Sequence, residues 1–436
     1  MNIRNIAFGL ALAFSFTVTV FGQVETEPAQ PVAPAVEQVE EAVEMAKDSE
    51  AEAPQTEAAE KEEPAPKEKA KPKKYEFTIK HNHDTTSVKD QGVTGTCWCF
   101  ASASFLESEL LREGKGEHNF SEMFIVKNIY MDKAFNYIHR SGKANFSEGA
   151  LAHDFIRAAS RHGLMPEEVY DGLDDDVTRH DHAEMAAVLT GFLDGIVKRR
   201  NLSPKWKEAF SAVVDTYLGS APENFTYEGK SYTPKSFAES IGFSEDNYVG
   251  ITSFNHHPFG RECVLEIPDN FSSGAFMNAP IEELVETIDY ALENGYTVAW
   301  DGDVSERGFN RNRGLAIMPT EESAAKAFKM PSDEIKFTQE MRQATFEEHT
   351  LTDDHLMHLT GVAVDQNGTK YYIIKNSWGE IGERDGYLYM SENYVRAKTI
   401  AITLHKDVVP SKYGGRVNTE MPEGNAANPA EPQAAK

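Results

Sequence analysis

Residues 91–98 read QGVTGTCW, a loop with two glycines that leads to a cysteine. The residues that follow predict a helix, because apolar side chains recur at helical spacing after Trp98 and Gly114 provides a stop. Cys97 therefore lies at the predicted start of a helix. Unpaired amide groups and the positive end of the helix dipole stabilise a thiolate there, so we expect a lowered thiol pKa and a nucleophilic cysteine.

The same loop offers a donor for an oxyanion. The loop brings the side-chain amide of Gln91 back toward the predicted helix start. That amide could join the backbone N–H of Cys97 in binding the negatively charged oxygen that develops during acyl transfer.

A nucleophilic cysteine also needs a base and a group that orients the base. Near the C-terminal end, the strand-like runs HLMHLTGVAVD and KYYIIKNSW are separated by residues 366–369, whose Asn-Gly pair is typical of a β-hairpin. The hairpin offers His355 or His358 as the base and Asn376 as the orienting amide. An amide fixes the imidazole ring without adding negative charge, and Trp378 could cover the hydrogen bond between the two.

The register of this hairpin leaves both histidines open. A two-residue turn at 367–368 places Leu359, and not His355, directly opposite Asn376. His355 and Leu359 share one face of the strand, whereas His358 points to the other face. A bulge or a longer loop is then required to bring His355 to Asn376.

Together these motifs resemble a known family. QGVTGTCW, then DHLMHLTGVAVD, then KNSWGE followed by GYLYM are similar to motifs of the papain-like cysteine peptidases, in that family's order of Cys, His and Asn. More narrowly, YTPKSFAESIGF and AWDGDV resemble the bleomycin hydrolase and aminopeptidase C branch. The resemblance covers about residues 75–406. It implies an α+β fold of two lobes, with the nucleophile helix in a helical lobe and the His and Asn in a β-rich lobe.

The resemblance also implies the catalytic residues, with no metal and no organic cofactor. They are the nucleophile Cys97, the base His355, the orienting amide Asn376 and the oxyanion donor Gln91. The pair Asp354-His355 stands six residues before Gly361, as in papain relatives, which favours His355 over His358. Trp98 and Trp378 are expected to support the site.

Some positions depart from the family's pattern. Gly149 matches the first glycine of a pair that binds the substrate backbone in the cleft, and Ala150 replaces the second glycine. Thr94 stands where secreted papain relatives carry a disulfide cysteine, and Thr96 replaces the usual small residue before the nucleophile.

Peptide substrates and aminopeptidase action follow from the resemblance, because in that branch a C-terminal arm lies in the cleft and its carboxylate captures the substrate's free amine. Here the chain continues into an Ala/Pro/Glu-rich segment, residues 410–436, which we expect to be a flexible tail. An endopeptidase with an open cleft is therefore an alternative, and homo-oligomerisation like that of the relatives stays open. A non-catalytic peptide-binding scaffold is a third alternative, against which the presence of all four catalytic residues argues.

The peptidase domain is expected at residues 75–409, with a large mixed insertion at about 171–259. Residues 1–22 place Arg4 ahead of an apolar run shorter than the ~20 residues of a spanning helix, which favours a signal peptide over an uncleaved anchor. Residues 23–74 lack aromatic side chains, so a disordered Glu/Ala/Pro/Lys-rich spacer is favoured over a folded pro-segment. We expect an exported protein, periplasmic or secreted, without a membrane segment after cleavage.

Two further helices are predicted within the domain. One begins at Ser147 and closes at Gly163, and the other covers residues 280–294 and leads into a strand at 297–300. With the hairpin, these elements indicate a helical first half and a β-rich second half.

Composition narrows the function further. The 436 residues include 70 acidic and 43 basic side chains, with a net charge of -27, so nucleic acids and anionic lipid surfaces would repel the chain. Its 3 cysteines cannot form a disulfide framework, and Cys99 and Cys263 are expected to be small buried side chains. The histidines at 256–257 lack metal-site spacing, and Asp301 and Asp303 are expected to cap a turn and not to form an acid–base pair.

Overall fold

The computed structural model describes residues 74–174 and 176–416. The expected signal peptide at 1–22, the expected spacer except Lys74, and most of the expected tail at 410–436 lie outside the described residues. Within the described ranges, no helix is long and apolar enough to cross a membrane.

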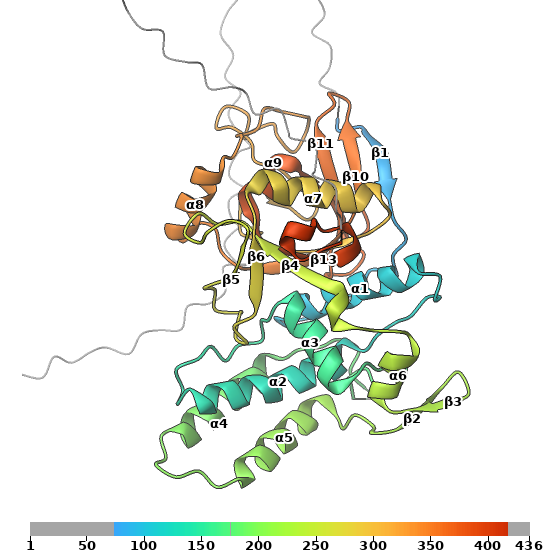
Figure 1. The fold of residues 1–436 in the computed structure, drawn as a ribbon, viewed down its shortest axis with the longest axis vertical. Helices are drawn as coiled ribbons and strands as arrows, with labels where there is room; N and C mark the ends of the chain where they lie inside the picture. Colours follow the sequence, from blue (N-terminus) through green and yellow to red (C-terminus); the bar gives the residue numbers. More distant parts are fainter. Residues whose placement is uncertain (1–73, 175, 417–436) are drawn as a thin grey trace, which may run out of the picture. The chain divides into compact units, whose positions relative to one another are not determined.

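The helices of the described residues lie mainly in the first half of the chain (Figure 1). They are α1 (Cys97–Arg112), α2 (Glu122–His139), α3 (Ala152–His162), α4 (Ala183–Val197), α5 (Lys205–Leu218), α6 (Pro234–Ser240), α7 (Ile281–Glu293), α8 (Gln339–Glu347) and α9 (Glu392–Lys398). Short 3-10 turns occur at η1 (Glu245–Asn247), η2 (Lys406–Val408) and η3 (Ser411–Tyr413). The helix predicted after the Cys97 loop and the helix predicted at 280–294 are both confirmed.

The helix predicted from Ser147 begins later than expected, at Ala152. Leu151 precedes the helix in an extended conformation, and its backbone N–H donates to the carboxylate of Asp154 at 3.1 Å. This contact satisfies one of the free groups at the helix start and sets the boundary. The helix ends at Gly163 as expected, where φ is 90°.

Most strands belong to one large sheet. The strands are β1 (Phe77–Asn82), β2 (Phe225–Tyr227), β3 (Lys230–Tyr232), β4 (Tyr248–Thr252), β5 (Arg261–Val264), β6 (Ala275–Asn278), β7 (Val298–Gly302), β8 (Phe309–Asn310), β9 (Leu315–Ala316), β10 (His355–Asp365), β11 (Lys370–Lys375), β12 (Tyr387–Ser391) and β13 (Thr399–His405). In the described residues, 11 strands form a sheet in the order β5-β6-β4-β13-β7-β10-β11-β12-β9-β8, with β1 paired to β10. β10 therefore has partners on β1, β7 and β11 and holds the centre of the sheet.

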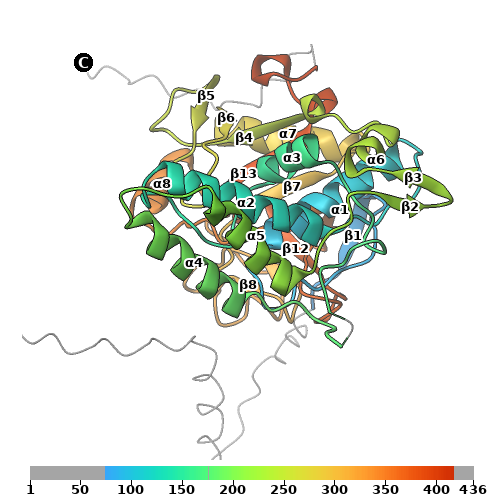
Figure 2. The same cartoon turned by 90° about the horizontal axis from the view of Figure 1, so that it is seen from below.

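Helices and sheet form two lobes with separate cores, which confirms the predicted α+β class. Helices α2 to α6 gather on one side, and α1 lies between them and the sheet (Figures 1 and 2). One core fills the helical lobe and includes Trp98, Phe105, Phe155, Leu189 and Phe210. The other core fills the β-rich lobe and includes Leu284, Trp300, Met357, Tyr394 and Ile402.

The segment expected as an insertion, residues 171–259, contains α4, α5, the β2–β3 hairpin and α6. Its last part, β4, pairs with β13 in the main sheet, with Ile251 opposite Ile402. The end of this segment is therefore part of the sheet itself.

The start of the expected tail also belongs to the folded body. Residues 411–413 form η3, and the side chain of Tyr413 is only 2% exposed within the core of the β-rich lobe. The Tyr413 hydroxyl donates a hydrogen bond to Glu283 of α7. The expectation of a flexible tail from residue 410 is therefore wrong for residues 410–416, because a buried aromatic side chain anchors them.

Candidate active site

Cys97 is the first residue of α1, and a tightly bonded loop delivers it. The Thr94 hydroxyl donates to the backbone oxygen of Gln91 at 2.8 Å, and Gln91 Nε2 donates to the backbone oxygen of Thr94 at 2.7 Å. Gly92 has φ +73°, and a Cβ there would stand 2.2 Å from the backbone oxygen of His180, so this close approach requires glycine. The loop thus holds the nucleophile position firmly.

The nucleophile helix packs against the strand that carries the histidines. α1 contacts β10 and β7. The backbone of Leu356 in β10 makes a hydrogen bond to the Cys97 thiol. Leu356 directly follows His355, so the packing brings the thiol to the start of β10 where His355 lies.

His355 and Asn376 are hydrogen-bonded, with His355 Nε2 at 2.7 Å from Asn376 Oδ1. The backbone N–H of Ser377 also donates to Asn376 Oδ1 at 2.7 Å, so this oxygen accepts and His355 Nε2 carries the proton. In the neutral ring, Nδ1 is then free to accept a proton. Trp378 stacks on the imidazole at 4.6 Å between ring centroids and 28° between planes, which shields the bond from water.

The β10–β11 hairpin reaches this arrangement with both a longer loop and a bulge. Asp365 and Thr369 flank a three-residue loop, with the Asp365 N–H donating to the Thr369 oxygen at 3.0 Å. A bulge between Leu359 and Gly361 shifts the register again, so that His358 pairs with Lys375. The two-residue turn expected from the sequence is therefore wrong, because Gly368 with φ 86° closes the longer loop.

The two candidate histidines are separated by the face on which they lie. His358 Nδ1 is 2.9 Å from Ser104 Oγ on α1, behind the nucleophile. It lies at the interface between helix and sheet, whereas His355 is the histidine bonded to Asn376. Asn376 is thus paired with His355, the histidine that the Asp354-His355 motif favours.

Burial, and not the helix dipole, dominates the charge state of the site. Cys97 is 8% exposed, and burial raises the pKa of its thiol to about 12, with nearby carboxyl groups adding to the effect. Burial lowers the pKa of His355 to about 4, although the hydrogen bond to Asn376 opposes this shift. The expected lowering of the thiol pKa is therefore wrong for this conformation, because burial shifts the pKa in the opposite direction.

Gln91 connects the nucleophile loop to the chain that follows Asn376. Gln91 Oε1 accepts from Ser377 Oγ at 2.8 Å, and the Gln91 backbone N–H donates to the Ser377 oxygen at 2.8 Å. One hydrogen of Gln91 Nε2 is used by the Thr94 oxygen. The other hydrogen has no partner among the described residues, and the role of Gln91 as oxyanion donor stays a prediction.

The predicted substrate-binding stretch is attached to the nucleophile helix. Trp98 Nε1 donates to the backbone oxygen of Glu148 at 3.0 Å, directly before the stretch. Gly149 lies under the side chain of Asp269, because a Cβ at Gly149 would stand 1.8 Å from Asp269 Oδ2. Ala150 is 1% exposed and packs in the helical core. Of the two positions, Gly149 is the one that lies toward the surface.

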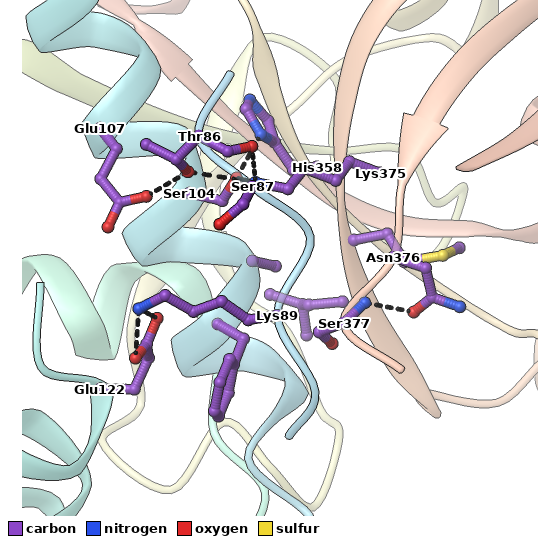
Figure 3. Close-up of a pocket in the computed structure, with 14 residues that line it drawn as sticks. Thr86, Ser87, Lys89, Ser104, Glu107, Glu122, His358, Lys375, Asn376 and Ser377 are labelled. Carbon is purple, nitrogen blue, oxygen red and sulfur yellow. Dashed lines mark hydrogen bonds and ion pairs between the residues drawn. The ribbon is translucent and has the colours of Figure 1, made fainter. Parts of the chain in front are cut away.

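A group of buried polar side chains lies behind the nucleophile, between α1 and the hairpin (Figure 3). Lys375 Nζ donates to the Thr86 backbone oxygen and to Ser104 Oγ, each at 2.8 Å. The Thr86 hydroxyl donates to Glu107 of α1 at 2.5 Å. The cavity they enclose has a volume of about 10 Å³, which is too small for a substrate. This group therefore holds the helix to the sheet.

The two acids at the end of β7 have different surroundings. Asp303 caps a turn as expected, accepting from the Ser305 N–H at 2.9 Å, and it pairs with Lys398 at 2.9 Å. Asp301 instead lies buried in β7 near Asp353, a residue that the sequence analysis did not single out. The sequence around Asp301 and Asp303 does not distinguish the two residues, because their surroundings come from segments distant in the chain.

One group of described side chains could hold a metal ion. The ligand atoms of His256, His257 and Glu266 lie within 4.8 Å of one another. Two imidazoles and a carboxylate are suitable ligands for a divalent transition metal. No motif spacing joins the two histidines to Glu266, so the sequence gives no sign of this group.

The two-lobe fold, with Cys97 at a helix start and the His355–Asn376 pair in the facing sheet, defines a papain-like cysteine peptidase. The chain belongs to the Peptidase C1-like family, whose model matches residues 202–426. This family confirms the resemblance noted in the sequence.

Characterised relatives extend over most of the chain. Aminopeptidase W of Lactobacillus delbrueckii subsp. lactis is 23% identical over 382 residues, covering 76% of this chain and 83% of the relative. Aminopeptidase C of Lactococcus lactis subsp. cremoris is 24% identical, covering 77% of this chain and 83% of the relative. A crystal structure of PepW from Lactobacillus rhamnosis HN001 has the same fold, with a TM-score of 0.61 at 17% identity, covering 77% of this chain and 84% of that one.

Proposed function

We propose that this cysteine peptidase is an aminopeptidase, which removes residues from peptides with a free N-terminal amine. The observation that carries the proposal is the His355–Asn376 pair at the start of the strand against which the Cys97 thiol packs. Relatives named aminopeptidase C and aminopeptidase W align over about three quarters of the chain. They support cleavage from the N-terminal end of the substrate.

The proposed first half-reaction transfers the acyl group to the enzyme. His355 Nδ1 takes the thiol proton as Cys97 Sγ bonds to the scissile carbonyl carbon. The backbone N–H of Cys97 and the free hydrogen of Gln91 Nε2 bind the oxyanion. As the carbon–nitrogen bond breaks, His355 gives its proton to the departing amine and a thioester remains.

The second half-reaction regenerates the enzyme. His355 removes a proton from a water molecule, whose oxygen attacks the thioester carbonyl. The carbon–sulfur bond breaks, the proton on His355 returns to Cys97, and the free acid leaves. Asn376 holds the imidazole in the tautomer that both halves need.

The test compares a fluorogenic aminoacyl amide that has a free α-amine with its N-acetylated form, using wild type and Cys97→Ala. We expect cleavage of the free-amine compound and a loss of more than about 10³-fold in kcat/KM for Cys97→Ala. Equal or faster cleavage of the acetylated compound would make the enzyme an endopeptidase. No cleavage of either, nor of longer peptides, would indicate a peptide-binding scaffold.

We also propose that the enzyme is exported, because Arg4 and the apolar run that follows have the pattern of a signal peptide. Cell fractionation and N-terminal sequencing test this, and a cytoplasmic chain that retains Met1 would contradict it. Homo-oligomerisation is a further proposal, supported by the resemblance to the aminopeptidase C branch. Light scattering that finds a single-chain mass would contradict that proposal.

A further inference from the structure

Three carboxyl groups surround the thiol of Cys97, and none of the proposed catalytic steps uses them. Asp301 lies in β7 directly opposite Leu356, the residue whose backbone bonds to the thiol. Paired strands are about 5 Å apart, so Asp301 is one strand away from that contact. Asp353 precedes His355 by two residues, and Asp269 packs on Gly149.

These carboxyl groups have few partners among the described residues. Asp301 is 3% exposed, and its side-chain oxygens contact no donor in that part of the chain other than the facing carboxyl group of Asp353. Oδ2 of Asp353 has no other hydrogen-bond partner there. Two facing buried carboxyl groups satisfy each other only by sharing a proton, and a cationic group that donates hydrogen bonds to both would replace that proton.

The nearby cation does not supply this partner. Lys133 acts on Asp269 and Asp353 at long range. Its Nζ donates to the backbone oxygens of Ser147 and Gly149, and no ion pair joins it to an acid among the described residues. Lys133 therefore holds the loop before α3. Asp269 Oδ1 accepts from Asn145 Nδ2 and Ser147 Oγ, each at 3.1 Å, and both donors are uncharged.

A groove of about 500 Å³ contains two of the acids that act on the thiol. Asp269 and Asp353 both line it. Its apolar walls come from Ile267, Pro268, Phe346 and Leu351. A ligand that fits this groove has a positive charge near Asp269 and Asp353 and an apolar body.

We propose that Asp269, Asp301 and Asp353 bind the α-ammonium group of the substrate and so select peptides with a free N-terminus. The α-nitrogen lies only about 2.5 Å from the carbonyl carbon of the same residue. An acid beside the nucleophile can therefore contact an α-ammonium, whereas a Lys or Arg side chain carries its charge at the end of a long stem. The inference rests on the proposed aminopeptidase function. It names the residues that would restrict the enzyme to the N-terminal end of peptides.

The main test is Asp353→Asn, because Asp353 lines the groove and its replacement keeps the side-chain size. Loss of a charged partner should lower kcat/KM for a free-amine aminoacyl amide by roughly 10- to 100-fold. Cleavage of the N-acetylated compound should not fall. Glu348→Gln is the matched control, since Glu348 is an exposed acid close in sequence that does not line the groove, and it should behave as wild type.

A second measurement separates recognition from damage to the site. L-leucinamide should inhibit wild type competitively and inhibit Asp353→Asn at least about 10-fold more weakly, whereas N-acetyl-L-leucinamide should not distinguish them. Asp353→Glu, which restores the charge, should recover part of the preference.

The outcomes distinguish this inference from the proposed function. If wild type shows no preference for the free amine, the aminopeptidase function itself is contradicted. If wild type has the preference and Asp353→Asn and Asp301→Asn both retain it, the function stands and these acids do not bind the amine. If the variants lose only Lys and Arg substrates, the acids bind a basic side chain and the inference is wrong.

Discussion

At the residue scale, burial has a larger effect on the pKa of the Cys97 thiol than its position at the start of a helix. The start of α1 offers free amide groups to a thiolate, yet burial raises the thiol pKa to about 12 and lowers the pKa of His355 to about 4.

Asp301 gives a stability prediction. Burial raises its pKa well above the ordinary value of 3.8, so the folded state retains a proton that the unfolded chain releases. Stability then falls as pH rises above about 4. We expect Asp301→Asn to be more stable than wild type at pH 7, because the amide carries no charge to bury.

Urea denaturation of wild type and Asp301→Asn at several pH values measures this effect. The difference between them should vanish at about pH 3.5, where the unfolded chain also holds the proton. A variant that is less stable than wild type at pH 7 would mean that the Asp301 carboxylate is already paired in the folded protein.

The sequence predicts this site unevenly. The motifs around Cys97, His355 and Asn376 name chemical roles, because nucleophile, base and amide are recognisable from residue type and order. The raised pKa of the Cys97 thiol depends mainly on its burial, to which Asp301, Asp353 and Asp269 add from segments far apart in the chain. Burial and contacts between distant segments cannot be recognised in a local sequence pattern. The direction predicted for the shift of the thiol pKa is therefore wrong.

At the element scale, the faces of the β10–β11 hairpin could be predicted from the sequence, but its loop length and register could not. Alternation along the strand correctly separates His355 from His358, because side chains on a strand point to opposite faces in turn. Loop length and the bulge near Thr360 are set by pairing with β1 and β7 as well as with β11. A hairpin considered alone therefore gives the wrong register.

The contact between α1 and β11 depends on Lys375. Its buried ammonium group bonds to the Thr86 oxygen and to Ser104, and it joins the helix to the sheet (Figure 3). We expect Lys375→Ala to destabilise the protein by about 1–3 kcal/mol, because it leaves buried acceptors without a donor. Urea denaturation measures the loss.

Lys370→Ala is the control on the same strand. Lys370 forms partly exposed ion pairs with Asp289 and Glu392, and such pairs contribute less than about 1 kcal/mol. If the two substitutions destabilise equally, the network around Lys375 has no special part in joining helix and sheet.

At the scale of the whole molecule, the two-lobe class followed from the sequence but the sheet did not. Strands β4, β5 and β6 extend the sheet beyond β13, although the sequence there shows mostly turns. Short strands with little alternation are not recognisable until their partners are known. The same reason explains why the fold continues past residue 409 to Tyr413.

Limited trypsin digestion tests these boundaries. The sequence predicts unfolded segments before Tyr75 and toward Lys436, and the structure anchors Tyr413 in the core. We expect a resistant fragment that starts near Tyr75 and ends at Arg416, measured by intact mass. Rapid cleavage after Lys412 would show that the anchor does not hold.

The central claim is that Cys97 is the nucleophile of a peptidase that acts on free amines. The most direct measurement is intact-mass and peptide-mapping analysis after treatment with an aminoacyl vinyl sulfone that has a free α-amine. We predict one added inhibitor per chain, on Cys97 and on neither Cys99 nor Cys263, with loss of all activity and no addition to the Cys97→Ala variant. Full activity without modification of Cys97, or an active chain modified only at another cysteine, would contradict the account.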